Sequence, residues 1–131
     1  ATPNYFWDMA VEDNVFISLK NMEGNIAFLQ ASCTEWKNMF SLEIYGKTGK
    51  LEVSGLGRSY GIETLTHHKM RPELGPPITE TWSFPEPDDS WALEIQDFIN
   101  DLRTGSRNSD NLGSSLEVLR VIGEIYSRTK K

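Results

Sequence analysis

The sequence predicts an α+β fold: an open-faced, mostly antiparallel β-sheet of about six strands, with two C-terminal helices on one of its faces. Two observations predict this class. Up to Phe84, short segments alternate apolar and polar residues, which is the period of half-buried strands. From Trp91 onward, apolar residues recur at helical spacing. Strands that all precede the helices are typical of α+β domains, and two helices leave one sheet face open to water or to a partner.

The strand pattern occurs in six segments, which turn residues separate. They are residues 13–20, 25–33, 40–45, 50–54, 62–68 and 78–84. The first two flank the turn residues 21–24, which indicates a hairpin. In this hairpin Val15, Ile17 and Leu19 share one face, and the lone Cys33 is expected to fill space in the core.

Two helices are expected after the strands. Residues 88–90, Asp-Asp-Ser, offer N-caps for the first helix, and Gly105 offers its C-cap. A polar loop is expected over 106–111. The second helix carries one apolar stripe from Leu112 to Tyr126, and the basic residues near its end suit the helix dipole. These basic residues are Arg128, Lys130 and Lys131.

Composition excludes several classes of protein. The 131 residues suit one domain, and an aromatic content of 11% argues against disorder. The net charge is −6 and the Lys and Arg residues are scattered, so we expect no nucleic-acid partner. A single cysteine allows no internal disulfide, and no apolar run approaches the roughly 18 residues that cross a bilayer. We therefore expect no membrane partner and a cytoplasmic location.

Two glycine motifs resemble phosphate-binding loops, but their contexts favour turns. Residues 46–48, Gly-Lys-Thr, match the end of a P-loop, yet Ser41 stands where that motif needs glycine and a strand follows. Residues 55–61 are close to the dinucleotide-binding fingerprint and also lead into a strand. His67 and His68 are adjacent on a strand and point to opposite faces, so they do not share a metal. The sequence therefore predicts no catalytic, cofactor-binding or metal-binding residue in this chain.

The candidate substrate-binding residues lie in two loops. Trp36, Lys37 and Asn38 combine an aromatic ring, a cation and an amide, groups that stack on sugars and bond their hydroxyls. A surface connector with a buried Trp explains these three equally well. Arg58 and Tyr60 lie in the glycine-rich loop, where they offer donors to sugar hydroxyls or phosphates. The alternative for this loop is a bend that only joins two strands.

Several short motifs, in order along the chain, resemble the C-terminal part of Gfo/Idh/MocA oxidoreductases. They are residues 12–14, 35–36, 43–46, 49–53 and 55–57, the helix residues Trp91, Glu94 and Phe98, and the closing residues 119–122 and 125–126. The resemblance covers nearly the whole chain and is to members that act on sugars or nucleotide sugars. It implies that residues 1–131 form one substrate and oligomerisation domain of a larger enzyme, whose Rossmann domain holds NAD(P). The aromatic residues 5–7, costly on a free terminus, agree with a longer parent protein.

The resemblance also defines what this chain lacks. No Gly-x-Gly-x-x-Gly precedes a helix, and the family's Glu-Lys-Pro segment is absent. Hydride transfer needs a positioned nicotinamide and a proton acceptor. We therefore expect the parent to be an NAD(P)-dependent enzyme and this chain to be inactive alone, with no bound cofactor. Its expected partners are the Rossmann domain, a sugar or nucleotide-sugar substrate, and further copies through the open sheet face. The alternative is a non-catalytic dimerisation or interaction module that uses the same face.

Overall fold

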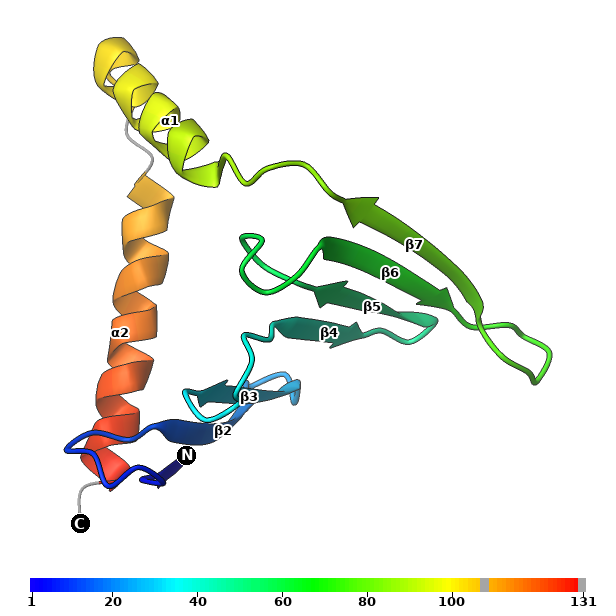
Figure 1. Cartoon of the computed structure of the whole chain (residues 1–131), viewed down its shortest axis with the longest axis horizontal. Coiled ribbons are helices and arrows are strands. Elements are labelled where there is room, and N and C mark those ends of the chain that lie inside the picture. The colour runs from blue at the N-terminus through cyan, green and yellow to red at the C-terminus, as the bar shows by residue number, and fades with distance from the viewer. Residues whose placement is uncertain (107–108, 130–131) are drawn as a thin grey trace. The chain divides into compact units, whose positions relative to one another are not determined.

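The computed structural model describes residues 1–106 and 109–129 of the chain (Figure 1). These residues form two compact units. The first unit combines Ala1–Trp36 with Asp97–Lys131, and the second is Lys37–Gln96. The class is α+β, as predicted, with seven strands and two helices among the described residues.

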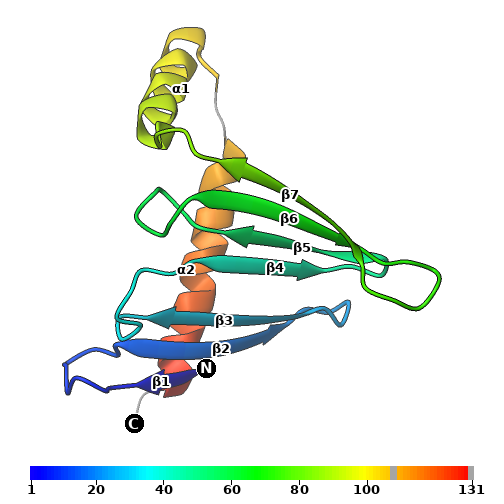
Figure 2. The ribbon, with the colours of Figure 1, turned by 45° about the vertical axis from the view of Figure 1, so that its right-hand side comes forward.

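The first unit contains a three-stranded antiparallel sheet in the order β1-β2-β3 (Figure 2). Its strands are β1 (Thr2–Asn4), β2 (Asn14–Lys20) and β3 (Ile26–Ser32). The pair β2–β3 is the predicted hairpin, and its register places Ile17 opposite Leu29 on one face. The short strand β1 was not predicted, because a three-residue strand that contains Pro3 shows no alternation.

The second unit contains a four-stranded antiparallel sheet in the order β4-β5-β6-β7 (Figure 2). Its strands are β4 (Ser41–Tyr45), β5 (Gly49–Ser54), β6 (Glu63–Lys69) and β7 (Ile78–Phe84). The predicted hairpin turn between β4 and β5 is confirmed, since the Gly46 N–H donates to the Gly49 carbonyl at 2.8 Å. The glycine-rich segment joins β5 to β6 and opens no helix, also as predicted.

The two faces of the four-stranded sheet differ in chemistry. One row that crosses all four strands is apolar, and the register places its members side by side. This row is Leu42, Val53, Leu65 and Trp82. The opposite face is polar. On it Lys50 donates to Glu43 at 2.7 Å and lies 3.1 Å from Glu52, and these bonds raise the pKa of Lys50.

The two predicted helices are present. Helix α1 (Ser90–Thr104) begins where the Asp88 carboxylate accepts the Ser90 N–H at 3.0 Å, and Gly105 follows its end with φ +68°. Helix α2 (Ser109–Thr129) begins earlier than the predicted loop allowed. Residues 107, 108, 130 and 131 lie outside the described residues, and with them part of the predicted loop and of the basic end. Within the described part of the chain, neither helix is long and apolar enough to cross a membrane.

The strands are arranged differently from the prediction, which was a single sheet of about six strands. They form two sheets, because the chain leaves the strand path between β3 and β4. The Thr34 hydroxyl donates a 3.1 Å hydrogen bond to the side chain of Asn14, the first residue of β2. This bond keeps Thr34 beside β2. Trp36 then adopts a left-handed backbone conformation with φ +57°, which no strand accommodates.

Neither sheet has a buried apolar core. Among the residues whose burial is described, no apolar side chain is buried, and even Leu51 on the inner strand β5 is exposed. Apolar burial contributes about 25 cal/mol per Å². Sheet faces with exposed apolar side chains are therefore stabilised by contact with further apolar surface.

Candidate functional site

The most buried polar groups of the described chain are two neighbours, Asp13 and Asn14. Their exposed fractions are 3% and 8%. The Asp13 carboxylate accepts the backbone N–H of Phe6 at 3.0 Å and that of Trp7 at 2.6 Å. The Asn14 amide also donates to it, at 3.1 Å. Asp13 therefore fixes the loop between β1 and β2 in one conformation.

Asn14 fixes a second segment, the one that follows β3. Its side-chain oxygen accepts hydrogen bonds from the hydroxyls of Ser32 and Thr34. The Cys33 N–H donates to the Asp13 carbonyl at 2.8 Å. The Asp13–Asn14 pair thus anchors two chain segments, Phe6–Trp7 and Ser32–Thr34, that are about 25 residues apart in sequence.

These two segments carry three aromatic rings that touch. The Phe6 and Trp7 ring centroids are 4.9 Å apart with perpendicular planes, and those of Trp7 and Trp36 are 5.6 Å apart at 76°. We call Phe6, Trp7 and Trp36 the aromatic platform. All three rings face solvent, with exposed fractions of 65%, 46% and 87%.

Backbone conformation is unusual on both sides of the aromatic platform. Asp8 has φ +54° and Trp36 has φ +57°. Non-glycine residues adopt this conformation at a cost of order 1–3 kcal/mol, and such residues concentrate at functional sites. Of the three non-glycine residues with positive φ among those described, Trp36 belongs to the aromatic platform, Asp8 directly follows Trp7 of the platform, and Arg58 lies elsewhere.

Opposing effects act on the pKa of the Asp13 carboxyl. Burial raises this pKa, while the hydrogen bonds from Trp7, Phe6 and Asn14 lower it. The hydrogen bonds prevail, so that the pKa lies below its usual 3.8. Asp13 is therefore ionised at neutral pH, and it acts as an anchor.

The boundary between the two units falls within the first predicted loop, directly after Trp36. Trp36 belongs to the first unit and to the aromatic platform, and it is exposed, so the buried-Trp alternative does not describe it. Lys37 and Asn38 belong to the second unit and are exposed ahead of β4.

The predicted residues of the second loop, Arg58 and Tyr60, lie in the second unit. The Arg58 guanidinium donates to the backbone carbonyls of Pro85 and Glu86, in the latter case at 3.0 Å. It thereby ties the glycine-rich loop to the connection between β7 and α1, beside a pocket of about 260 Å³. Tyr60 is exposed in the same loop.

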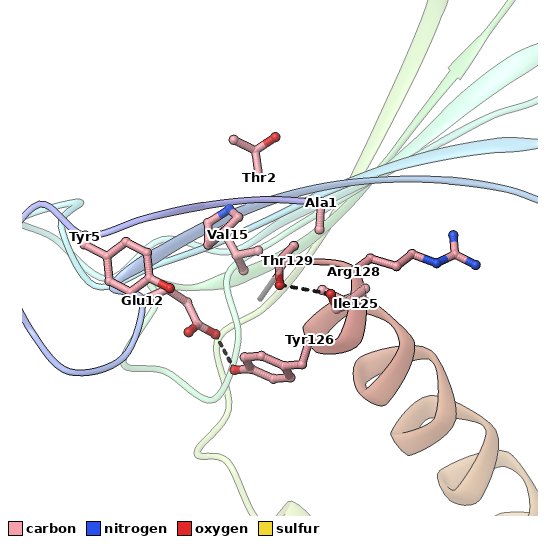
Figure 3. A pocket seen from close by; sticks show the side chains of 10 residues that line it. Ala1, Thr2, Tyr5, Glu12, Val15, Ile125, Tyr126, Arg128 and Thr129 are labelled. Atoms are coloured by element: carbon pink, nitrogen blue, oxygen red, sulfur yellow. Dashed lines mark hydrogen bonds between the residues drawn. The ribbon is translucent and has the colours of Figure 1, made fainter. Parts of the chain in front are cut away.

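A larger pocket, of about 600 Å³, lies in the first unit between the β1–β2 segment and the last turns of α2 (Figure 3). The Tyr126 hydroxyl donates to the Glu12 carboxylate there, which lowers the pKa of Glu12 and raises that of Tyr126. Much of the remaining lining is small or apolar, including Val15 and Ile125. The hydrogen bond joins the β1–β2 loop to the end of α2, and it occupies the only carboxylate among the described residues of this lining.

Sequence reasoning missed Phe6, Trp7 and Asp13 as parts of one cluster with Trp36. The aromatic run 5–7 was visible, but only the hydrogen bonds of Asp13 and Asn14 bring it to Trp36. A second correction concerns Cys33, which was expected in the core and is an exposed free thiol just after β3. Its short side chain stands where the chain leaves the sheet.

Comparisons with protein-family models, with curated proteins and with solved structures gave no match for this chain.

Proposed function

We propose that this chain is the non-catalytic sheet domain of an NAD(P)-dependent oxidoreductase that acts on a sugar or nucleotide sugar. In this role it lines the substrate site and makes subunit contacts, while a Rossmann domain binds the dinucleotide. The packing of the two helices on one sheet face stays a prediction, and the subunit contact proposed here uses the apolar face of the four-stranded sheet. The oxidoreductase part rests on the ordered motifs between residues 12 and 126 that resemble the Gfo/Idh/MocA family.

The single observation that carries the subunit-contact role is the exposed apolar face of the four-stranded sheet. Leu42 and Trp82 lie at the two ends of an apolar row on this face, and both are exposed. The other face presents ion pairs and hydroxyls, for example Lys50 with Glu43 and Thr66 with Thr81. An antiparallel sheet with one apolar and one polar face normally covers the apolar one.

Light scattering of purified protein tests the contact. Leu42→Glu places a charge in the apolar row and is expected to shift the chain from a dimer or larger species to a monomer at about 50 µM, because an unpaired charge is costly to bury. Ser41→Glu is the matched control, since Ser41 is the preceding residue of β4 and faces the polar side. Loss of association in both variants, or a natural chain that is monomeric at 50 µM, contradicts the proposal.

A separate experiment tests the proposal that this chain does not bind the dinucleotide and that a Rossmann domain does. Because the chain carries no dinucleotide fingerprint, titration with NADH or NADPH is expected to leave the nicotinamide fluorescence unchanged. The coding sequence upstream is expected to encode a Rossmann domain in the same reading frame. Micromolar NADH binding by this chain contradicts the division of roles between the two domains, and a reading frame without a Rossmann domain contradicts the oxidoreductase assignment.

A second candidate, a self-contained interaction module, is favoured by the same apolar face and by the absence of buried apolar side chains among the residues whose burial is described. The interaction module predicts the same light-scattering result as the first proposal. The two proposals differ in what they predict upstream, because the module needs no Rossmann domain in the same reading frame. An upstream frame without a Rossmann domain, together with a dimer that Leu42→Glu dissociates, selects the module.

A further inference from the structure

We infer that the aromatic platform of Phe6, Trp7 and Trp36 is a stacking site for the ring of a neutral carbohydrate. This inference rests on the proposed function in one respect, namely that the ligand is a sugar. It assigns binding to Phe6 and Trp7, which the sequence did not single out, and it places Trp36 at the centre of the site.

The first argument is preorganisation. Asp13 and Asn14 are the most buried polar groups described, and their hydrogen bonds hold both segments that carry the rings. A ring fixed before binding loses less conformational freedom when a ligand arrives. The only strongly buried polar side chains of the described chain thus support three exposed rings, an arrangement that core packing alone does not require.

The geometry of the rings selects stacking over enclosure. Centroid distances of 4.9 and 5.6 Å are those of edge-to-face rings in direct contact. An aromatic cage for an organic cation needs a gap between its walls, and these rings leave none. What they offer is the outer face of Trp36, which is nearly fully exposed and is braced from one side by Trp7.

Charge supports the choice of a neutral ligand. Asp8 follows Trp7 in the sequence, Glu35 and Lys37 stand on either side of Trp36, and the whole chain carries a net charge of −6. Ionised carboxylates accept hydrogen bonds and donate none, so they suit sugar hydroxyls and repel phosphate. A neutral pyranose, with an apolar C–H face for the indole and hydroxyls at its rim, matches both features.

The natural chain is tested by NMR titration with methyl β-glucoside, N-acetylglucosamine and uridine monophosphate. At least one of the two sugars is expected to shift the indole N–H signals of Trp7 and Trp36 in a saturable way, with a Kd in the millimolar range. Trp36→Asn removes the ring but tolerates the left-handed backbone, and it is expected to weaken binding by about tenfold or more. Trp36→Phe keeps a flat ring and is expected to retain part of the affinity.

The matched control is Trp91→Ala, which removes another exposed Trp from helix α1 and is expected to leave sugar binding unchanged. Unshifted amide signals of Asp13 and Asn14 show that the Trp36→Asn variant keeps its fold. The inference is overturned if neither sugar gives a saturable shift up to about 100 mM, if Trp36→Asn binds as the natural chain does, or if the nucleotide binds more tightly than both sugars. None of these outcomes touches the association test at Leu42 or the upstream reading frame, so a failure here is distinct from a failure of the proposed function.

Discussion

Asp13 joins two segments of the chain through its hydrogen bonds. Its carboxylate accepts hydrogen bonds from three groups, and its backbone carbonyl accepts a fourth, from Cys33. The sequence marked Asp13 as the start of a strand and as part of the motif at residues 12–14, and not as an anchor. Its partners Phe6 and Trp7 are six or seven residues away in the loop between β1 and β2, where neither helical nor strand periodicity applies. The conformation of that loop, which brings these backbone N–H groups to Asp13, is not encoded in a periodic pattern.

Acid is expected to release the Phe6–Trp7 loop through the titration of Asp13. The pKa of this carboxyl is lower in the folded chain than its usual 3.8, so the anchoring is complete above about pH 4 and is lost as the pH falls through the lowered value. The measurement is the amide chemical shift of Trp7 between pH 6 and pH 2. A local probe is needed because the pKa values of Glu12, Glu43 and Asp88 are also lowered, so overall acid stability reports several groups together.

Asp13→Asn supplies the control for this titration. The amide keeps the shape of the carboxyl group and does not ionise, so the Trp7 signal of the variant is expected to lose its acid transition. A variant that retains the same transition would show that another carboxyl group controls the loop.

At the scale of elements, sequence periodicity predicted well wherever it was long. Strand β7 (Ile78–Phe84) matches its predicted range, because seven alternating residues define both ends. Helix α1 (Ser90–Thr104) begins and ends at its predicted caps. The misses are local exceptions to periodicity: β1 is too short to alternate, and the break at Trp36 depends on contacts with Trp7 that alternation does not encode.

The glycine-rich loop between β5 and β6 contains one glycine that no other residue replaces well. Gly55 has φ +84°, and a Cβ there would lie 2.7 Å from the Ile62 carbonyl oxygen. Gly55→Ala is therefore expected to destabilise the second unit by about 2 kcal/mol or more, from backbone strain and a clash together. Urea unfolding followed by circular dichroism measures the change.

Gly61→Ala is the matched control in the same loop. Gly61 also has positive φ, +102°, but nothing lies within 4 Å of the added Cβ. Its cost is expected to be about 1 kcal/mol, from backbone strain alone. Equal effects of the two substitutions would mean that the close approach to Ile62 is not maintained in solution.

At the scale of the whole molecule, the described residues bury no apolar side chain, although the strand faces separate apolar from polar residues as the sequence predicts. The alternation of residues along a strand specifies which face of the sheet is apolar and is therefore stabilised by contact with further apolar surface. It does not specify what covers that face, because the partner's residues are not part of the alternating pattern. The sequence of this chain thus predicts an apolar face that is open to a partner. It does not identify the partner that covers this face.

If further copies of the chain cover these faces, thermal stability must depend on protein concentration. A hundredfold rise in concentration favours a folded dimer by about 2.7 kcal/mol, which corresponds to an increase in Tm of about 5 °C for a chain of this size. Differential scanning calorimetry between about 2 and 200 µM measures it. The Leu42→Glu variant is expected to show a lower Tm with no such dependence, since Leu42 belongs to the apolar row. A Tm of the natural chain that is constant over this range would contradict self-association through the apolar face.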